Sequence, residues 1–146
     1  MNLLNQFNAF FKKAGEIKTP TNRKDFWIQF IIFFVTASIL ATLSPFIQLI
    51  PYLGILIYYF CLIYIQFAFI SLSIRRLHDA GYSGWWTILW ALGMFFFKGL
   101  VKTHMNYDYQ QMMIGNFFIF FSFIPIIILW CQKTKSKNNK YLVSNK

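Results

Sequence analysis

Long apolar stretches, charged only at Lys98 in the third, alternate along the chain with short polar stretches that carry the other charges. The apolar stretches run over about 26–44, 52–74, 85–100 and 113–131. At about 1.5 Å of rise per residue, a helix as long as the first stretch reaches roughly 30 Å, the thickness of the hydrocarbon core of a bilayer. The pattern therefore predicts an all-α integral membrane protein with four transmembrane helices.

Residues 1–18 precede these spans and show a different pattern. Leu3, Phe7 and Phe10 recur at helical spacing, and two lysines lie on the other side of the same helix. The segment is too short to cross a bilayer, so two alternatives stay open. It lies in the membrane interface as an N-terminal amphipathic helix, or it packs on the protein's own cytoplasmic face. We take the interfacial helix as the working prediction.

The remaining boundaries follow from breaks in the apolar pattern. Residues 19–131 form the predicted four-span membrane domain, and 132–146 form a basic cytoplasmic tail that we expect to be disordered. Asn22, with Asp25 three residues later, predicts a capping-box-like start for the first span. The third span is short and holds Lys98 near its end, so a re-entrant segment is the alternative. Four crossings are preferred because they place the tail charges on the same side as the other bases.

Composition excludes an ordinary soluble domain. Hydrophobic residues make up 58% of the chain and charged residues only 12%, against about 25% charged in a typical soluble protein. The formal net charge of +10 would suggest nucleic acid if the protein were soluble. Here the bases lie at the edges of the apolar stretches, where cytoplasmic retention of positive loops and anionic headgroups explain them. We expect membrane lipids, including anionic ones, as partners and no nucleic acid.

The distribution of charge predicts the orientation in the membrane. Twelve of the 14 Lys and Arg residues lie before the first span, after the second span or in the tail, and only Lys98 and Lys102 lie at the other side. With four crossings these twelve share one face, which the positive-inside rule makes cytoplasmic, so both termini are predicted to be cytoplasmic. Four tryptophans fall at the same boundary and are predicted interface anchors: Trp27, Trp85, Trp86 and Trp130.

The densest group of polar side chains lies at the cytoplasmic end of the second span. Arg75 and Arg76 are four and three residues before Asp79, so either can pair with it on a helix. The charges that begin the first span lie at the same depth, so the two groups can meet. Asp25 can then form an ion pair with Arg76, and Asp79 with Arg23. The residues of this predicted site for anionic lipid or a partner are Arg23, Lys24, Asp25, Arg75, Arg76, His78 and Asp79.

Three interpretations of this cluster stay open. It is architectural, it binds a phosphate-bearing ligand such as a lipid headgroup, or His78 acts as an acid–base catalyst. Catalysis is disfavoured because no nucleophile or second carboxylate lies beside His78. The second histidine, His104, falls on the opposite face, so we expect no metal site and no cofactor. A non-enzymatic protein is the leading hypothesis, and a small oligomeric transporter or pore, which would need a homo-oligomer, is the alternative.

Two motifs resemble a known family. Residues 23–27 (RKDFW) are similar to an "RKEFW" opening, and residues 75–86 (RRLHDAGYSGWW) resemble an "RRLHDxGxSGWW" signature. Both belong to a bacterial family of small inner-membrane proteins named domain of unknown function 805. The chain departs from it at Thr19-Pro20, where the family usually has Gly-Arg. The resemblance implies a bacterial inner-membrane location and no established activity.

Overall fold

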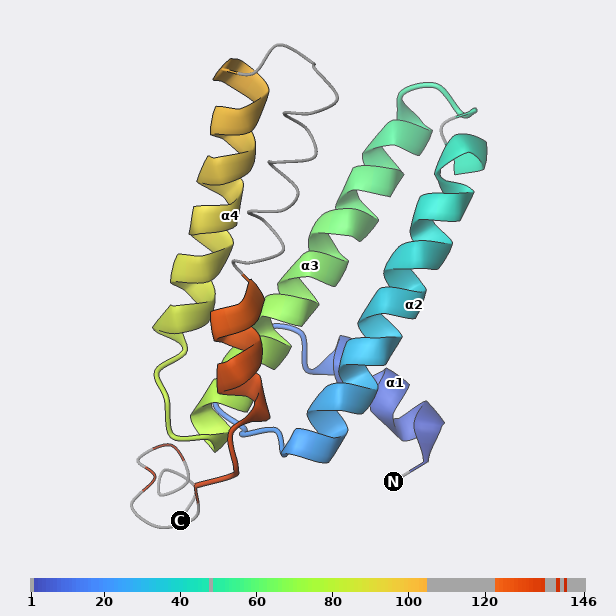
Figure 1. Cartoon of the computed structure of the whole chain (residues 1–146). Coiled ribbons are helices and arrows are strands. Elements are labelled where there is room, and N and C mark those ends of the chain that lie inside the picture. Colours follow the sequence, from blue (N-terminus) through green and yellow to red (C-terminus); the bar gives the residue numbers. More distant parts are fainter. Residues whose placement is uncertain (1, 48, 105–122, 136–138, 140, 142–146) are drawn as a thin grey trace.

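The described part of the protein is helical throughout (Figure 1). The computed structural model describes residues 2–47, 49–104, 123–135, 139 and 141, with only the backbone described for 95–104. The helices are α1 (Leu3–Lys12), α2 (Arg23–Ile47), α3 (Leu53–Asp79) and α4 (Trp85–His104), followed by a helical segment at 123–131. The all-α prediction is thus confirmed for these residues. The first part of the predicted fourth span, 113–122, lies outside them.

The start of α2 has the predicted capping geometry. The Asn22 side-chain oxygen accepts a hydrogen bond from the Asp25 backbone N–H at 2.8 Å, and the Asn22 amide donates to the Asp25 carboxylate, also at 2.8 Å. The first N–H groups of a helix have no partner inside it, so these bonds fix where α2 begins.

The two longest helices, α2 and α3, run antiparallel and side by side (Figure 1). Each is long and apolar enough to cross a membrane. Only 11% of the most apolar stretch of α2 and 22% of that of α3 is buried. A core helix of a soluble protein would bury most of such a stretch, so the described structure leaves these two helices largely uncovered.

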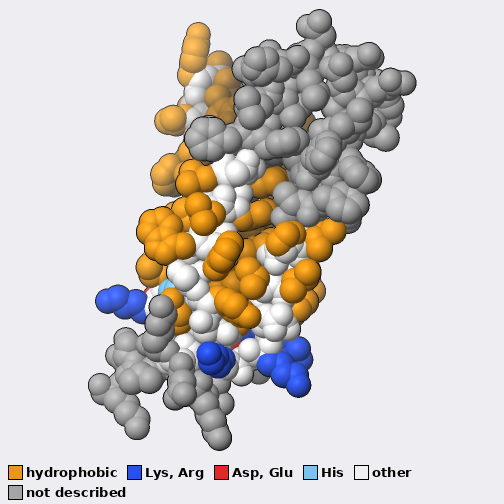
Figure 2. All heavy atoms as spheres, turned by 60° about the vertical axis from the view of Figure 1, so that its left-hand side comes forward, with side chains coloured by type: hydrophobic (Ala, Val, Ile, Leu, Met, Phe, Trp, Pro, Cys, Tyr) orange, Lys and Arg blue, Asp and Glu red, His pale blue; other side chains and the backbone are white. Residues whose placement is uncertain are grey.

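The buried core lies at one end of this helix pair. Phe33 of α2 stacks on Phe69 of α3 with 4.2 Å between ring centroids, and Trp130 lies 5.2 Å from Phe26 and 5.7 Å from Phe69. Further along the helices, side chains such as Ile39 are more than half exposed. Figure 2 shows this apolar surface, with the described Lys and Arg side chains of that face gathered at one end of it.

Helix α1 packs on the lower part of α2 and α3 (Figure 1). Gln6 and Phe10 are fully buried there, whereas Leu3, Leu4 and Phe7 are 68%, 70% and 46% exposed. Packing on the protein, one of the two alternatives for this segment, is therefore observed for one side of α1. Its position in the membrane interface stays a prediction, in which the exposed Leu3 and Leu4 would contact lipid.

Candidate functional site

The charged C-terminal end of α3 is buried. Arg75, Arg76 and Asp79 are only 1%, 0% and 4% exposed, although such residues are almost never buried without partners. Two segments far from α3 in sequence cover this end: the α1–α2 linker, 13–22, and the residues that follow Leu129. We call α3 residues 71–79 together with their contacts to these two segments the α3 clamp.

Arg76 is the centre of the clamp. Its Nε donates to the Trp130 carbonyl at 2.9 Å, its Nη1 pairs with the Asp79 carboxylate, and its Nη2 donates to the Gln132 carbonyl. Thr134 donates its hydroxyl proton to the same Asp79 carboxylate at 2.7 Å. Every nitrogen of this guanidinium is therefore occupied inside the protein. The predicted pairing of Asp79 with a motif arginine is present, and Arg76 is the partner.

The predicted ion pairs between the two charged groups, Asp25 with Arg76 and Asp79 with Arg23, are wrong. Asp25 accepts a hydrogen bond from the Gln6 amide at 2.5 Å, and the Gln6 carbonyl oxygen accepts one from Gln29 at 2.8 Å. Asp25 thus fastens α1 to α2 and does not meet Arg76, because a neutral amide from α1 lies closer. Its flanking residues Arg23 and Lys24 are exposed at the same end of the molecule.

The α1–α2 linker lies along another side of the clamp. Ser71 donates to the Glu16 carbonyl at 2.9 Å, His78 Nδ1 lies 2.9 Å from the Ile17 carbonyl, and the Thr21 N–H donates to the Arg75 carbonyl at 3.3 Å. The backbone carbonyl of Ile17 therefore lies beside the His78 ring. A carbonyl contact of this kind gives the ring a fixed orientation.

Arg75 differs from its neighbour Arg76. The described structure gives its Nε and Nη2 no hydrogen-bond partner, although both atoms are buried. The carboxylate that acts on it electrostatically is Glu16 of the linker. A buried guanidinium with two nitrogens that make no hydrogen bond is a costly arrangement, so Arg75 is less well satisfied than Arg76.

The described residues of the tail, 132–135, 139 and 141, lie at the end of α3 and cap it, whereas the rest of the predicted disordered tail lies outside the described residues. The Asn139 amide donates to the His78 carbonyl at 2.9 Å and to the Asp79 carbonyl at 3.2 Å, and the Lys135 N–H donates to Asp79 O at 3.0 Å. Tyr141 stacks on the His78 ring with 3.9 Å between centroids. The last carbonyls of a helix need donors, and these described tail residues supply them. Composition does not predict this contact, because nothing in a Lys/Asn-rich tail distinguishes the Asn that caps the helix from the other Asn residues.

The four tryptophans divide into two kinds. Trp85 and Trp86 are 67% and 55% exposed, and Trp27 is half-buried, so their surfaces are open to a membrane interface. Trp130 is 0% exposed. It has no surface to offer an interface, because it packs between α2 and α3, and the structure makes it a core residue instead of an anchor.

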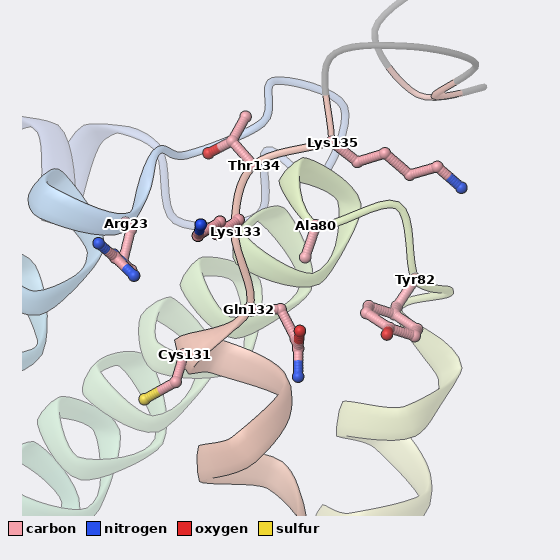
Figure 3. Close-up of a pocket in the computed structure, with 8 residues that line it drawn as sticks. All are labelled: Arg23, Ala80, Tyr82, Cys131, Gln132, Lys133, Thr134 and Lys135. Atoms are coloured by element: carbon pink, nitrogen blue, oxygen red, sulfur yellow. The ribbon is translucent and has the colours of Figure 1, made fainter.

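A basic pocket of about 570 Å³ lies beside the clamp (Figure 3). Figure 3 shows Arg23 projecting from the start of α2, with Lys133 and Lys135 on the segment after the last helical turn. The residues that line it are Arg23, Ala80, Tyr82, Cys131, Gln132, Lys133, Thr134 and Lys135. Three of these are cations and none is a carboxylate. The pocket is therefore suited to an anion such as a phosphate group.

The clamp positions the lysines of this pocket. The Lys135 backbone is bonded to Asp79, and its aliphatic chain lies so close to Gly81 that a Cβ there would sit 2.8 Å from Lys135 Cδ. Gly81 also has φ +82°, a conformation that L side chains rarely adopt. Sequence reasoning found Arg23 of this pocket and missed its lysines, because it assigned them to a disordered tail.

No metal site is apparent in the part of the chain that the structure describes: no three His, Cys, Asp or Glu side chains gather there. A family model described as "Protein of unknown function (DUF805)" matches residues 16–142. No curated protein and no solved structure matches the chain. The matched region includes the clamp, the pocket and Asn139, whereas α1 lies before it.

Proposed function

Since the chain belongs to the DUF805 family, whose description names no activity, we propose its function from the charged end of the structure. It is a multi-pass protein of the bacterial inner membrane, with both termini in the cytoplasm, that holds the phosphate groups of anionic lipids in its basic pocket. It is not an enzyme in this proposal. The confirmed family resemblance supports the location, and the geometry supports the ligand.

The exposure of α2 and α3 supports a membrane location. Both helices are long enough to cross, and most of their apolar side chains face outward. Contiguous apolar surface of this extent is rare on a soluble monomer and ordinary for a protein in lipid. The seven exposed bases of the described chain lie outside the apolar halves of these helices: Lys12, Lys13, Lys18, Arg23, Lys24, Lys133 and Lys135.

The single observation that carries the ligand is the pocket with three cations and no lining carboxylate. It lies at the end of the apolar surface, where a lipid headgroup would be. Lys and Arg near an anionic leaflet each contribute about 1 kcal/mol of attraction, and a guanidinium such as Arg23 can bind two phosphate oxygens at once. Gln132 and Tyr82 add side chains that can donate hydrogen bonds to a phosphate.

This proposal changes the role of the RR motif. Arg76 is 0% exposed and its nitrogens are occupied, so it does not contact a headgroup. It acts on the ligand indirectly, because it holds the carbonyls of Trp130 and Gln132 and so fixes the course of the segment that carries Lys133 and Lys135. In this proposal Arg76 has the architectural role, and the lipid contacts are made by Arg23, Lys133 and Lys135.

Native mass spectrometry of the protein in mixed-lipid nanodiscs tests this. The triple variant Arg23→Gln, Lys133→Gln, Lys135→Gln should lose retained anionic lipid by at least about tenfold, since three cations are removed at about 1 kcal/mol each. The matched control is Lys12→Gln, Lys13→Gln, Lys24→Gln, which removes the same charge from outside the pocket. Equal loss in both variants would show a diffuse surface effect and contradict the pocket. Displacement of the lipid by millimolar inorganic phosphate would instead identify a soluble phosphate ligand.

A further inference from the structure

An apolar groove on the outer face of α3 contains a polar side chain. The groove has a volume of about 380 Å³ and is lined by Tyr59, Leu62, Ile63, Gln66, Phe67 and Ile70. Tyr59 and Ile63 are 59% and 68% exposed, and Gln66 is exposed as well. The described residues therefore leave this face of α3 uncovered along about three turns.

Gln66 lies well inside the apolar part of the helix. It is midway between Leu53 and Asp79, about 20 Å from either by helical rise, and nine residues before Arg75. An amide has two N–H donors and an acceptor oxygen. In the hydrocarbon region no water satisfies them, and an unpaired polar group there costs several kcal/mol. No hydrogen bond to the described residues involves this amide.

The hydroxyl groups of α2 make the contrast clear. Thr36, Thr42 and Ser44 each donate at 2.8 Å to a carbonyl three or four residues earlier in their own helix. These residues satisfy their donors locally and need no partner from outside. A glutamine amide projects further from its helix than a hydroxyl, so its partner is expected from a neighbouring helix.

The spacing of the groove residues matches a helix-pairing seam. Tyr59, Ile63, Gln66 and Ile70 follow one another at intervals of four, three and four residues, the spacing that keeps a and d positions on one face of a coiled coil. Helix α2 uses a different face of α3, whose buried members are Ile65, Ala68, Phe69 and Leu72. The seam is thus a second packing face, separate from the one filled within the chain.

We propose that a second copy of this chain covers the seam, with two parallel α3 helices related by a two-fold axis along the membrane normal and their Gln66 amides hydrogen-bonded to each other. A copy with the same orientation places its own Gln66 at the same depth, so each amide meets a group that is both donor and acceptor. Lipid chains fill an apolar groove equally well but leave the amide unpaired. The inference rests on the membrane location proposed above.

Disulfide cross-linking in native membranes tests the geometry. In a background of Cys61→Ser and Cys131→Ser, Tyr59→Cys, a change on the seam that leaves Gln66 in place, should form a covalent dimer on mild oxidation. Phe60→Cys is the matched control, since Phe60 is 71% exposed on the same helix but points about 100° away from Tyr59 and about 120° away from Gln66. Equal cross-linking at both positions, or none at Tyr59→Cys, would overturn the proposed pairing.

The association equilibrium tests the amide itself. An interhelical hydrogen bond of this kind changes a dimerisation constant by about 3- to 30-fold, so Gln66→Leu should weaken dimerisation by that factor in single-molecule photobleaching of reconstituted protein. Gln66→Asn should restore part of it, and Phe60→Leu should have no effect. An unchanged dimer fraction for Gln66→Leu refutes the role of the amide. Carbonate extraction of the same membranes separates the two proposals: a protein that stays in the membrane as a monomer refutes the pairing alone, and one that is extracted refutes the membrane location.

Discussion

The two ends of the α2–α3 pair differ in what they bury and what they expose. At the α3 clamp, charged groups are buried and the protein supplies their partners from segments 54 to 61 residues away in the chain. At the other end, apolar side chains such as Ile39 and Leu56 lie exposed, and the hydroxyls of Thr42 and Ser44 bond within their own helix. The clamp depends on the protein for its hydrogen bonds, whereas the apolar end depends on its surroundings for cover.

This difference teaches that the two ends tolerate different changes. Removal of a polar partner harms the clamp, because it leaves another group buried without a partner. Addition of a charge should harm the apolar end in the proposed membrane location, because lipid cannot solvate it. Each prediction below places a change at one end and a matched change elsewhere.

The largest effect is expected at the centre of the clamp. Arg76→Ala removes the bonds to Trp130 and Gln132 and leaves Asp79 as a buried unpaired carboxylate. Breaking a buried ion pair in this way costs about 3–5 kcal/mol. Titration with a denaturing detergent in mixed micelles measures the loss in free energy of unfolding. The control is Lys24→Ala, at an exposed position. A similar small change in both variants would mean that the clamp contributes little to stability.

At the apolar end, a charge placed on the exposed face of α2 should impair insertion. Val35 is 53% exposed, and Val35→Arg should cost about 2.5–3.5 kcal/mol of insertion free energy if that face meets lipid. The fraction of newly made protein that resists carbonate extraction measures this. Gln132→Arg adds the same charge at the clamp end and should insert normally. Full insertion of Val35→Arg would contradict a lipid-facing α2.

A smaller effect is expected where α1 joins the clamp end. Gln6 is fully buried between Asp25 and Gln29, so Gln6→Ala should cost about 1–3 kcal/mol through the groups it leaves unpaired. Hydrogen exchange of α1 amides should speed up. Asn5→Ala, on the exposed side of the same helix, should leave exchange unchanged. If both variants behave alike, the amide chain does not hold α1.

The smallest effect is expected at the tail cap. Asn139→Ala removes donors from the His78 and Asp79 carbonyls and should cost about 0.5–1.5 kcal/mol. Hydrogen exchange near Ala80 and proteolysis of the tail both report the loosened cap. Asn139→Asp keeps the shape but removes the donors, so it should loosen the cap at least as much. Wild-type behaviour of Asn139→Asp would show that these bonds do not hold the tail.

Local rules predicted much of this structure. The start of α2 follows from Asn22 and Asp25, and the Arg76–Asp79 pair follows from helical spacing, because both depend on residues three positions apart. The long apolar helices follow from composition. The family resemblance, carried by residues 23–27 and 75–86, is confirmed as well.

Contacts between residues far apart in the chain could not be predicted from the sequence. The Gln6–Asp25 bond spans 19 residues and the Asn139–His78 bond spans 61, and no periodicity relates such positions. The tail was assigned disorder because its composition is polar and basic. That rule describes the average of a segment and not the few donors that reach a helix end, which is why the lysines of the basic pocket were missed.

The position of the clamp partners in the chain has a consequence for biosynthesis. Arg76 leaves the ribosome 54 residues before Trp130, so two of the three partners of the guanidinium, the Trp130 and Gln132 carbonyls, are missing until the last helical segment has been made. During that interval Asp79 is its sole described ion-pair partner, and the end of α3 must stay near water. The clamp end is therefore assembled last, and in the proposed membrane location a ribosome that stops before residue 130 releases helices that can insert without a finished clamp.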